Sequence, residues 1–194
     1  DNGIAADLKF DLLLTVGDIE SVLGLNDQAQ AHFDAAGTLL DQLPALARDR
    51  LDIERQKLLN NRGDNAAAEA LSAQLLARID SGQSQLQAVD QASALIGRGN
   101  ALNLLGRGAE AEPLLRRALA LVPTDRANAR MRAAANGQLG QILQNLGRLD
   151  EAEAYLRESL AISEANGFDP YRISRDQNNL AGVLAMQGRF AEAL

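Results

Sequence analysis

The sequence contains few side chains that could carry out catalysis or bind a metal ion. His32 is the only histidine, and the 194 residues include no cysteine. Histidine-rich metal sites, thiolate sites and Cys–His pairs all need residues that this chain lacks. His32 stands beside the apolar Phe33 in a helical pattern, so we expect it at the surface or at the boundary between surface and core. We predict no enzyme activity, no cofactor and no metal ion.

Other polar patterns also have simple explanations. Gly97-Arg98-Gly99 is similar to part of a nucleotide-binding loop, but it lacks the full glycine fingerprint and no strand precedes it. Asp150 and Glu151 open a predicted helix, where capping accounts for acidic residues. The net charge of −7 argues against a nucleic-acid partner. No segment approaches the roughly 20 apolar residues that span a bilayer. We predict a cytoplasmic protein without nucleic-acid or membrane partners.

An internal repeat positions these side chains. Similar segments begin at Gly106, Gly147 and Gly188, at intervals of 41 residues. A fainter copy begins at Gly24, two such intervals before Gly106, and a weak one at Gly63, two residues earlier than the interval predicts. A repeat of this length indicates an array of similar structural units.

Each copy is predicted to be two helices joined at its glycine. Around Gly147, apolar residues recur at helical spacing before the glycine (Leu139, Leu143, Leu146) and after it (Ala152, Leu156, Leu160). Glycine ends a helix readily because it accepts a positive φ. Alanine and leucine are abundant, and aromatic residues make up only 3%. This composition favours closely packed helices over sheets.

The third copy resembles a tetratricopeptide repeat (TPR). The resemblance rests on small or apolar residues at fixed positions, namely Gly99, Gly106, Ala111, Leu115 and Ala118. The fourth copy has Gly140, Ala152 and Leu156, with Ser159 in place of the second alanine. The period exceeds the usual 34 or so residues and is similar to the kinesin-light-chain-like branch, whose NNLA signature matches residues 178–181. HEAT and armadillo repeats share the period but not this pattern of small residues.

The resemblance implies an all-α fold, a right-handed α-α superhelix (TPR solenoid) of about 4.5 helix-turn-helix repeats. We predict one domain over residues 1–194 that is a fragment of a longer protein. Its repeats are expected at about 10–42, 49–80, 92–123, 133–166 and a truncated 174–194. The second repeat keeps little of the pattern beyond Gly63 and Ala68.

In such a superhelix the first helix of each repeat lines a concave groove. The resemblance then places these residues in the groove: Lys57, Asn60, Asn100, Asn103, Gln138, Gln141, Gln144, Arg175, Asn178 and Asn179. Most are amides, which donate and accept hydrogen bonds and can therefore hold the backbone of an extended peptide. The alternative is that these amides are only solvated.

The predicted function is a protein–protein interaction scaffold that binds a peptide or protein in this groove. A second hypothesis is the regulatory or sensor TPR region of a bacterial signalling protein, because residues 5–29 resemble the opening of TPR regions that follow the kinase domain in bacterial serine/threonine kinases. A transcription regulator is another such host. We also expect the apolar face formed by Leu180, Val183, Leu184 and Phe190 to be left partly uncovered. Either a longer natural chain covers this face, or a partner chain does, and self-association through the uncapped C-terminal repeat is one form of the second alternative.

Overall fold

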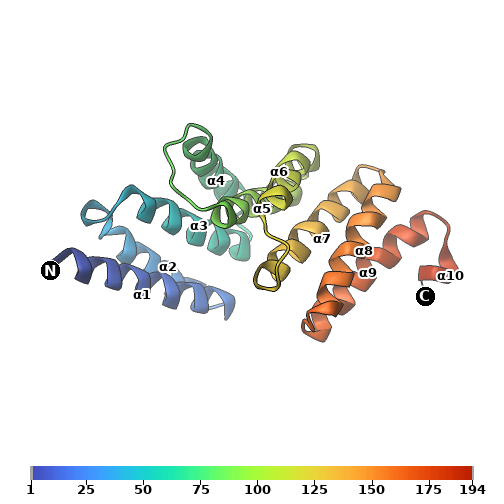
Figure 1. Cartoon of the computed structure of the whole chain (residues 1–194), viewed down its shortest axis with the longest axis horizontal. Helices are drawn as coiled ribbons and strands as arrows, with labels where there is room; N and C mark the ends of the chain where they lie inside the picture. The colour runs from blue at the N-terminus through green and yellow to red at the C-terminus, as the bar shows by residue number, and fades with distance from the viewer. Residues whose placement is uncertain (1, 194) are drawn as a thin grey trace. The chain divides into compact units, whose positions relative to one another are not determined.

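The computed structural model describes residues 2–193, with side chains from residue 5 onward, and this part of the chain is built of paired helices (Figure 1). The first helices of the pairs are α1 (Asn2–Val22), α3 (Ala45–Arg62), α5 (Ala88–Leu104), α7 (Ala129–Asn145) and α9 (Pro170–Met186). The second helices are α2 (Asn26–Gly37), α4 (Asn65–Asp80), α6 (Gly108–Leu121), α8 (Leu149–Ala165) and α10 (Phe190–Ala193). Short 3-10 turns, Leu40–Gln42 and Arg126–Asn128, precede α3 and α7. The predicted all-α class and helix-turn-helix repeats are confirmed.

The chain divides within α5 into two compact units, of which one ends at Ala101 and the other begins at Leu102. The first unit holds α1 to α4 and most of α5, and the second holds the end of α5 and α6 to α10. Each unit has its own set of buried side chains, as described below. The organisation as one domain over residues 1–194 stays a prediction.

A glycine in the left-handed region forms the turn between the two helices of each pair. The five glycines at the turns have φ between +75° and +78°: Gly24, Gly63, Gly106, Gly147 and Gly188. At Gly147 the amide nitrogen donates to the carbonyl of Gln144 at 3.0 Å, and the amide of Arg148 donates to that of Leu143 at 2.9 Å. These bonds satisfy carbonyls that the end of a helix leaves unpaired. The role predicted for the turn glycine is therefore confirmed.

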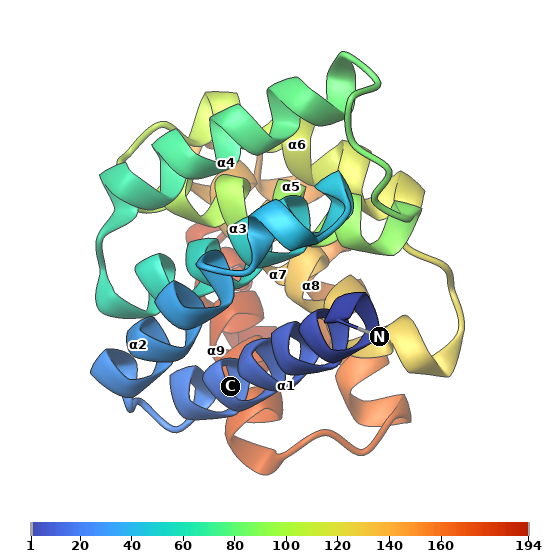
Figure 2. The same ribbon diagram turned by 90° about the vertical axis from the view of Figure 1, so that its left-hand side faces the viewer.

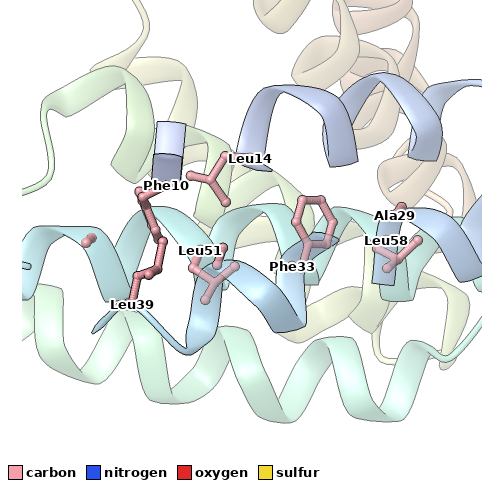
Figure 3. Close-up of a cluster of buried hydrophobic side chains, with 9 residues drawn as sticks. Phe10, Leu14, Ala29, Phe33, Leu39, Leu51 and Leu58 are labelled. Carbon is pink, nitrogen blue, oxygen red and sulfur yellow. The ribbon is translucent and has the colours of Figure 1, made fainter. Parts of the chain in front are cut away.

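The first unit is held together by an apolar cluster from α1, α2 and α3 (Figure 3). Its largest members are fully buried, and those labelled in the figure are Phe10, Leu14, Ala29, Phe33, Leu39, Leu51 and Leu58. Phe33 packs against Gly17 so closely that a Cβ on this glycine would lie 2.5 Å from the ring. A small residue on the first helix thus admits a large one from the second.

The second unit repeats that arrangement between α7 and α8. A Cβ on Gly140 would lie 2.6 Å from Cγ of Leu156 and 3.2 Å from the carbonyl oxygen of Ala152. Gly140 stands seven residues before its turn glycine, as Gly17 does, and Leu156 stands nine residues after it, as Phe33 does. The small-to-large contact implied by the TPR pattern is present in both units.

The α3–α4 pair does not repeat this contact. Seven residues before Gly63 the chain has Gln56, which is only 1% exposed, and nine residues after it has Ser72, which is fully buried. Gln56 donates from Nε2 to the carbonyl of Ala94 at 3.2 Å, and Ser72 donates from Oγ to that of Ala68 at 2.6 Å. A Cβ on Gly97 would lie 2.6 Å from the Gln56 side chain, so the large side chain of this first helix packs against α5.

The α3–α4 pair also contains a buried ion pair. Arg78 donates from Nε to Oδ1 of Asp49 at 2.8 Å and also bonds Oδ2 of Asp52. Counted from the turn glycine, Asp49 and Arg78 stand where the first repeat has Phe10 and Leu39, both in the apolar cluster of Figure 3. Burial raises the pKa of Asp52, although the bond from Arg78 opposes this effect. Charged residues thus replace an apolar pair, which explains the weak sequence match of this repeat.

Arginines and glutamates form a ladder along the turn edge of the second unit. Arg148, just after its turn glycine, bonds Glu151 at 2.7 Å and Glu112 of the preceding repeat at 2.8 Å. Arg189 repeats the pattern one period later, with Glu192 at 2.7 Å and Glu153 at 2.6 Å. Hydrogen bonds from arginine lower the pKa values of the three partially exposed glutamates Glu151, Glu153 and Glu192. Each turn is thereby tied to the repeat before it.

The C-terminal apolar face is smaller than the sequence predicts. Leu180, Val183 and Leu184 are buried, whereas Phe190 is 65% exposed. Only one of the four residues predicted to form an uncovered face therefore presents most of its surface. Self-association through this repeat stays a prediction.

Candidate peptide-binding faces

The side chains predicted to bind a peptide lie on the first helix of each pair: α3, α5, α7 and α9. Asn60, Asn103 and Gln144 stand three residues before their turn glycines, while Lys57 and Gln141 stand six before. Residues three apart share one face of a helix, so each helix presents its amides together. The two units are described separately below.

In the first unit, most of these side chains already have partners. Lys57 donates to Glu54 at 2.8 Å and lies 3.9 Å from Asp18. Asn60 donates from Nδ2 to the carbonyl of Gly97 at 3.1 Å, and its Oδ1 is buried without a partner. Asn100 is half-buried and has no hydrogen-bond partner among residues 2–193. Of this group, only the Asn100 side chain makes no hydrogen bond or ion pair within the described chain.

An ionic cluster on α1 and α3 was not predicted from the sequence. Burial raises the pKa of Glu54, and the nearby Asp18 carboxylate adds to this effect, whereas Lys57 opposes it. Arg50 donates to Asp11 at 2.7 Å on the same two helices. The two residues of each pair are about 40 positions apart in the sequence. They stand equally far before their own turn glycines, and only this equivalence could have predicted the pairs.

In the second unit, α7 and α9 present mainly amides. Gln141 donates from Nε2 to Oδ1 of Asn179 at 3.2 Å, and Gln144 donates to the sulfur of Met186 at 3.2 Å. The Oε1 atom of Gln138 is buried without a partner. The structure therefore brings the predicted glutamines of α7 against α9, where they join neighbouring repeats.

Other predicted residues remain available in this unit. Asn178 is exposed, Asn103 is half-buried, and the side-chain amide of neither has a partner within the described chain. Arg175 is exposed and lies 3.7 Å from the carboxylate of Asp176. Asp176 is only 1% exposed and accepts a hydrogen bond from Ser163 at 2.7 Å. Sequence analysis missed this buried acid, because its repeat position is apolar in other copies, such as Leu51.

These faces can hydrogen-bond a ligand, and none of the predicted residues forms a catalytic arrangement. His32 lies within α2 and is half-buried, with Nδ1 2.7 Å from Glu20, as expected for a residue at the boundary between core and surface. Among the described residues, no group of three or more histidine or acidic side chains is placed to hold a metal ion. No helix in this part of the chain combines the length and apolar character needed to cross a membrane.

Comparison with known families identifies the fold. The tetratricopeptide repeat family model matches residues 90–165 and 130–194, which together make up more than half of the chain. The chain belongs to the tetratricopeptide repeat family. The matched residues run from α5 to the C-terminal repeat, so they include the Gly140–Leu156 contact and the arginine ladder but neither α1–α2 nor α3–α4. A comparison with curated proteins finds no match.

Solved TPR proteins share this fold at low sequence identity. A Rap protein complexed with Competence and Sporulation Factor is 18% identical, with a TM-score of 0.76, over 96% of this chain and 51% of its own. A putative kinesin light chain from Podospora anserina is 19% identical, with a TM-score of 0.70, over 94% of this chain and 89% of its own. YrrB, a TPR protein with an unusual peptide-binding site, is 17% identical, with a TM-score of 0.60, over 94% and 79%. The chain thus spans about half of the Rap protein.

Proposed function

We propose that this TPR chain is an interaction scaffold that binds an extended polypeptide through amide side chains of its first helices. The observation that carries the proposal is a set of amides without partners in the described chain: Asn100, Asn103 and Asn178. An amide can donate to a peptide carbonyl and accept from a peptide N–H at once. Because this pairing involves only the backbone, it is compatible with many ligand sequences.

The proposal assigns different roles to two groups of amides. Asn60, Gln141 and Asn179 make hydrogen bonds within the fold and hold successive first helices together. Asn100, Asn103 and Asn178 are left to bind the ligand, and Arg175 is exposed close to Asn178 in sequence. Arginine would favour a peptide segment with a carboxylate or a free C-terminus near it.

Two relatives support a polypeptide ligand. YrrB is described by its peptide-binding site, and the Rap protein was solved in complex with Competence and Sporulation Factor. Both have the fold of this chain at 17–18% identity, so they support the class of ligand and not its sequence. A cytoplasmic location and the absence of nucleic-acid and membrane partners remain predictions.

The proposal can be tested by selecting ligands from a displayed library of random peptides. We expect the wild-type chain to enrich peptides whose affinity can then be measured by fluorescence anisotropy. The variant Asn100→Ala/Asn103→Ala/Asn178→Ala should bind them at least tenfold more weakly, since one tenfold step is about 1.4 kcal/mol and each net hydrogen bond contributes about 1 kcal/mol.

The matched control changes three exposed polar residues on second helices, as Gln74→Ala/Glu158→Ala/Glu164→Ala. This control should bind the selected peptides with unchanged affinity. Equal affinity for the wild type and the Asn100/Asn103/Asn178 variant would rule out the amide mechanism. A failure to enrich any peptide would count against the scaffold itself.

A second candidate is the regulatory region of a bacterial signalling protein, either a serine/threonine kinase or a transcription regulator. The resemblance of residues 5–29 to TPR regions that follow kinase domains favours it. The test is the gene that encodes this chain. A kinase or DNA-binding domain encoded upstream of Asp1 is expected, and a gene without either domain would exclude this candidate.

A further inference from the structure

The outer face of α1 carries a continuous row of exposed apolar side chains. Leu8, Leu12, Ile19 and Val22 are between 53% and 77% exposed, although large apolar side chains are normally buried. Within the first unit, α2 and α3 lie against the opposite side of α1, which buries Phe10 and Leu14 (Figures 1 and 2). Helix α1 is therefore apolar on two opposite faces, and only one of them is covered within its unit.

The spacing of the exposed row matches a coiled-coil seam. With Ala5 and Thr15, which are also exposed, the row is Ala5, Leu8, Leu12, Thr15, Ile19 and Val22. Consecutive members alternate between three and four residues apart, as a and d positions do in a heptad repeat. We call this row the α1 seam. It runs along nearly all of the 21 residues of the helix.

Later first helices use the same positions to pack on a neighbour. Counted from the turn glycine, Leu12 and Ile19 correspond to Leu51 and Leu58 in α3, which are fully buried in the cluster shared with α1 and α2. The corresponding Ala135 and Ile142 of α7 are also fully buried. The α1 seam thus occupies the positions that join neighbouring repeats at later first helices.

The polar atoms beside the α1 seam are already satisfied. Thr15 donates from Oγ1 to the carbonyl of Asp11 at 2.8 Å, so its hydroxyl can be buried without losing a partner. Along one flank, Asp11 bonds Arg50 at 2.7 Å, and Asp18 lies 3.9 Å from Lys57. That flank is close to neutral despite the net charge of −7, so two copies can approach without strong repulsion there.

We propose that the α1 seam pairs in antiparallel orientation with the α1 seam of a second copy of this chain. A two-fold interface needs a patch that complements itself. In an antiparallel pair, Leu8 meets Ile19 of the other copy, Leu12 meets Thr15, and Ala5 meets Val22. Each contact then joins an a to a d position, and the two polar threonines lie near the dyad.

The turn after α1 lacks the arginine that ties repeats together in the second unit, and it extends the apolar surface. In the second unit, neighbouring repeats are tied by the arginine after the turn glycine, Arg148 or Arg189. The first repeat has Leu25 there, which is 45% exposed. Leu23 is 68% exposed and extends the apolar surface at the end of α1. The dimer does not depend on the proposed peptide binding, so either idea can fail alone.

Sedimentation equilibrium of the whole chain tests the proposal. We expect a reversible monomer–dimer equilibrium for the wild type, and a monomer for Leu12→Arg/Ile19→Arg at the same concentrations. Each substitution enters a two-fold interface twice, so the dissociation constant should rise more than a hundredfold. Both residues are exposed in the monomer, so circular dichroism and the melting temperature of the dilute variant should stay close to those of the wild-type monomer.

Met186→Glu/Phe190→Glu is the matched control, because it removes two exposed apolar residues from the C-terminal repeat. This control should dimerise like the wild type. A wild type that stays monomeric over a hundredfold range of concentration would overturn the proposal, as would a dimer that survives the Leu12/Ile19 variant. A dimer that is lost only in the Met186/Phe190 variant would place self-association at the C-terminus instead.

The absence of cysteine allows the orientation to be tested directly. In the antiparallel pair, a mixture of Leu8→Cys and Ile19→Cys chains should form a mixed disulfide-linked dimer on mild oxidation. Neither variant should cross-link efficiently alone, because its own cysteines lie 11 residues apart along the seam, about 16 Å at 1.5 Å per residue. Efficient cross-linking of Leu8→Cys alone would show a parallel pair and contradict the antiparallel arrangement.

Discussion

The α3–α4 and α7–α8 pairs have the same backbone plan but different internal packing. Both place a positive-φ glycine between two helices. In α7–α8, Gly140 receives Leu156, whereas in α3–α4 the equivalent positions hold a buried Gln56 and a buried Ser72. The α3–α4 pair also buries the carboxylates of Asp49 and Asp52, which pair with Arg78.

This difference shows which part of the repeat is indispensable. The turn glycine is kept in both pairs, because a residue with a Cβ is strained at that φ. The small-to-large contact is not kept in α3–α4, where Gln56 instead bonds the carbonyl of Ala94 and lies against Gly97 of α5. A sequence pattern that fixes residue types at single positions therefore loses the α3–α4 pair.

The largest expected effect comes from breaking the charged core of α3–α4. Arg78→Met should lower the free energy of unfolding by roughly 3 kcal/mol, because it leaves buried carboxylates without their counter-ion. Urea unfolding measures this loss. The triple variant Asp49→Leu/Asp52→Leu/Arg78→Leu restores an apolar set and should be at least as stable as the wild type. An Arg78→Met protein as stable as the wild type would mean that the buried pair contributes nothing.

The packing of Gln56 on α5 should appear as coupling between two positions. Gly97→Ala places a Cβ 2.6 Å from the buried Gln56 side chain, so a loss of about 1 kcal/mol is expected. In a chain that also carries Gln56→Ala, the loss caused by Gly97→Ala should be smaller. Urea unfolding of the wild type, both single variants and the double variant gives the coupling energy. Simple additivity of the two changes would argue that these positions do not share one space.

Two helix glycines should respond to alanine with opposite signs. Gly140→Ala puts a Cβ 2.6 Å from Leu156 and 3.2 Å from a backbone oxygen, so it should destabilise by about 1 kcal/mol. At Gly182 the nearest atom would be 3.5 Å away, on the flexible Gln144, so Gly182→Ala should gain about 0.5 kcal/mol from helix propensity. Thermal unfolding measures both changes. Stabilisation by both changes would show that propensity, not packing, decides at Gly140, and destabilisation by both would contradict the open space at Gly182.

The smallest effect should be an opposite response of the two pairs to pH. Burial raises the pKa of Asp52, so α3–α4 should lose stability as pH rises from the ordinary carboxyl pKa of about 4 through the raised value. Arginine lowers the pKa values of Glu151 and Glu153, so α8 should lose stability as pH falls below about 4 through the lowered values.

Hydrogen exchange, corrected for the intrinsic rate at each pH, measures protection of α4 and α8 separately. Asp52→Asn should flatten the response of α4, and Glu151→Gln/Glu153→Gln should flatten that of α8. Parallel pH responses of the two helices in the wild type would contradict the assigned shifts.

Much of the local structure could be predicted from sequence because it depends on neighbouring residues. Leu139, Leu143 and Leu156 follow the helical period, and all three are buried. The turn at Gly147 followed from one residue type. The amide faces could be predicted only in part, because whether Gln141 is free or bonded to Asn179 depends on a helix 38 residues away.

The sequence by itself determined the helices, their turns and the repeat, since these follow from short-range periodicity and from the conformational freedom of glycine. Only the tertiary structure decided which polar side chains form hydrogen bonds within the fold and which remain available to a ligand. It paired Arg78 with Asp49 across 29 residues and left the α1 seam exposed. The physical reason is that burial and hydrogen-bond partners are set by packing between helices, whose side chains meet in space and not along the chain.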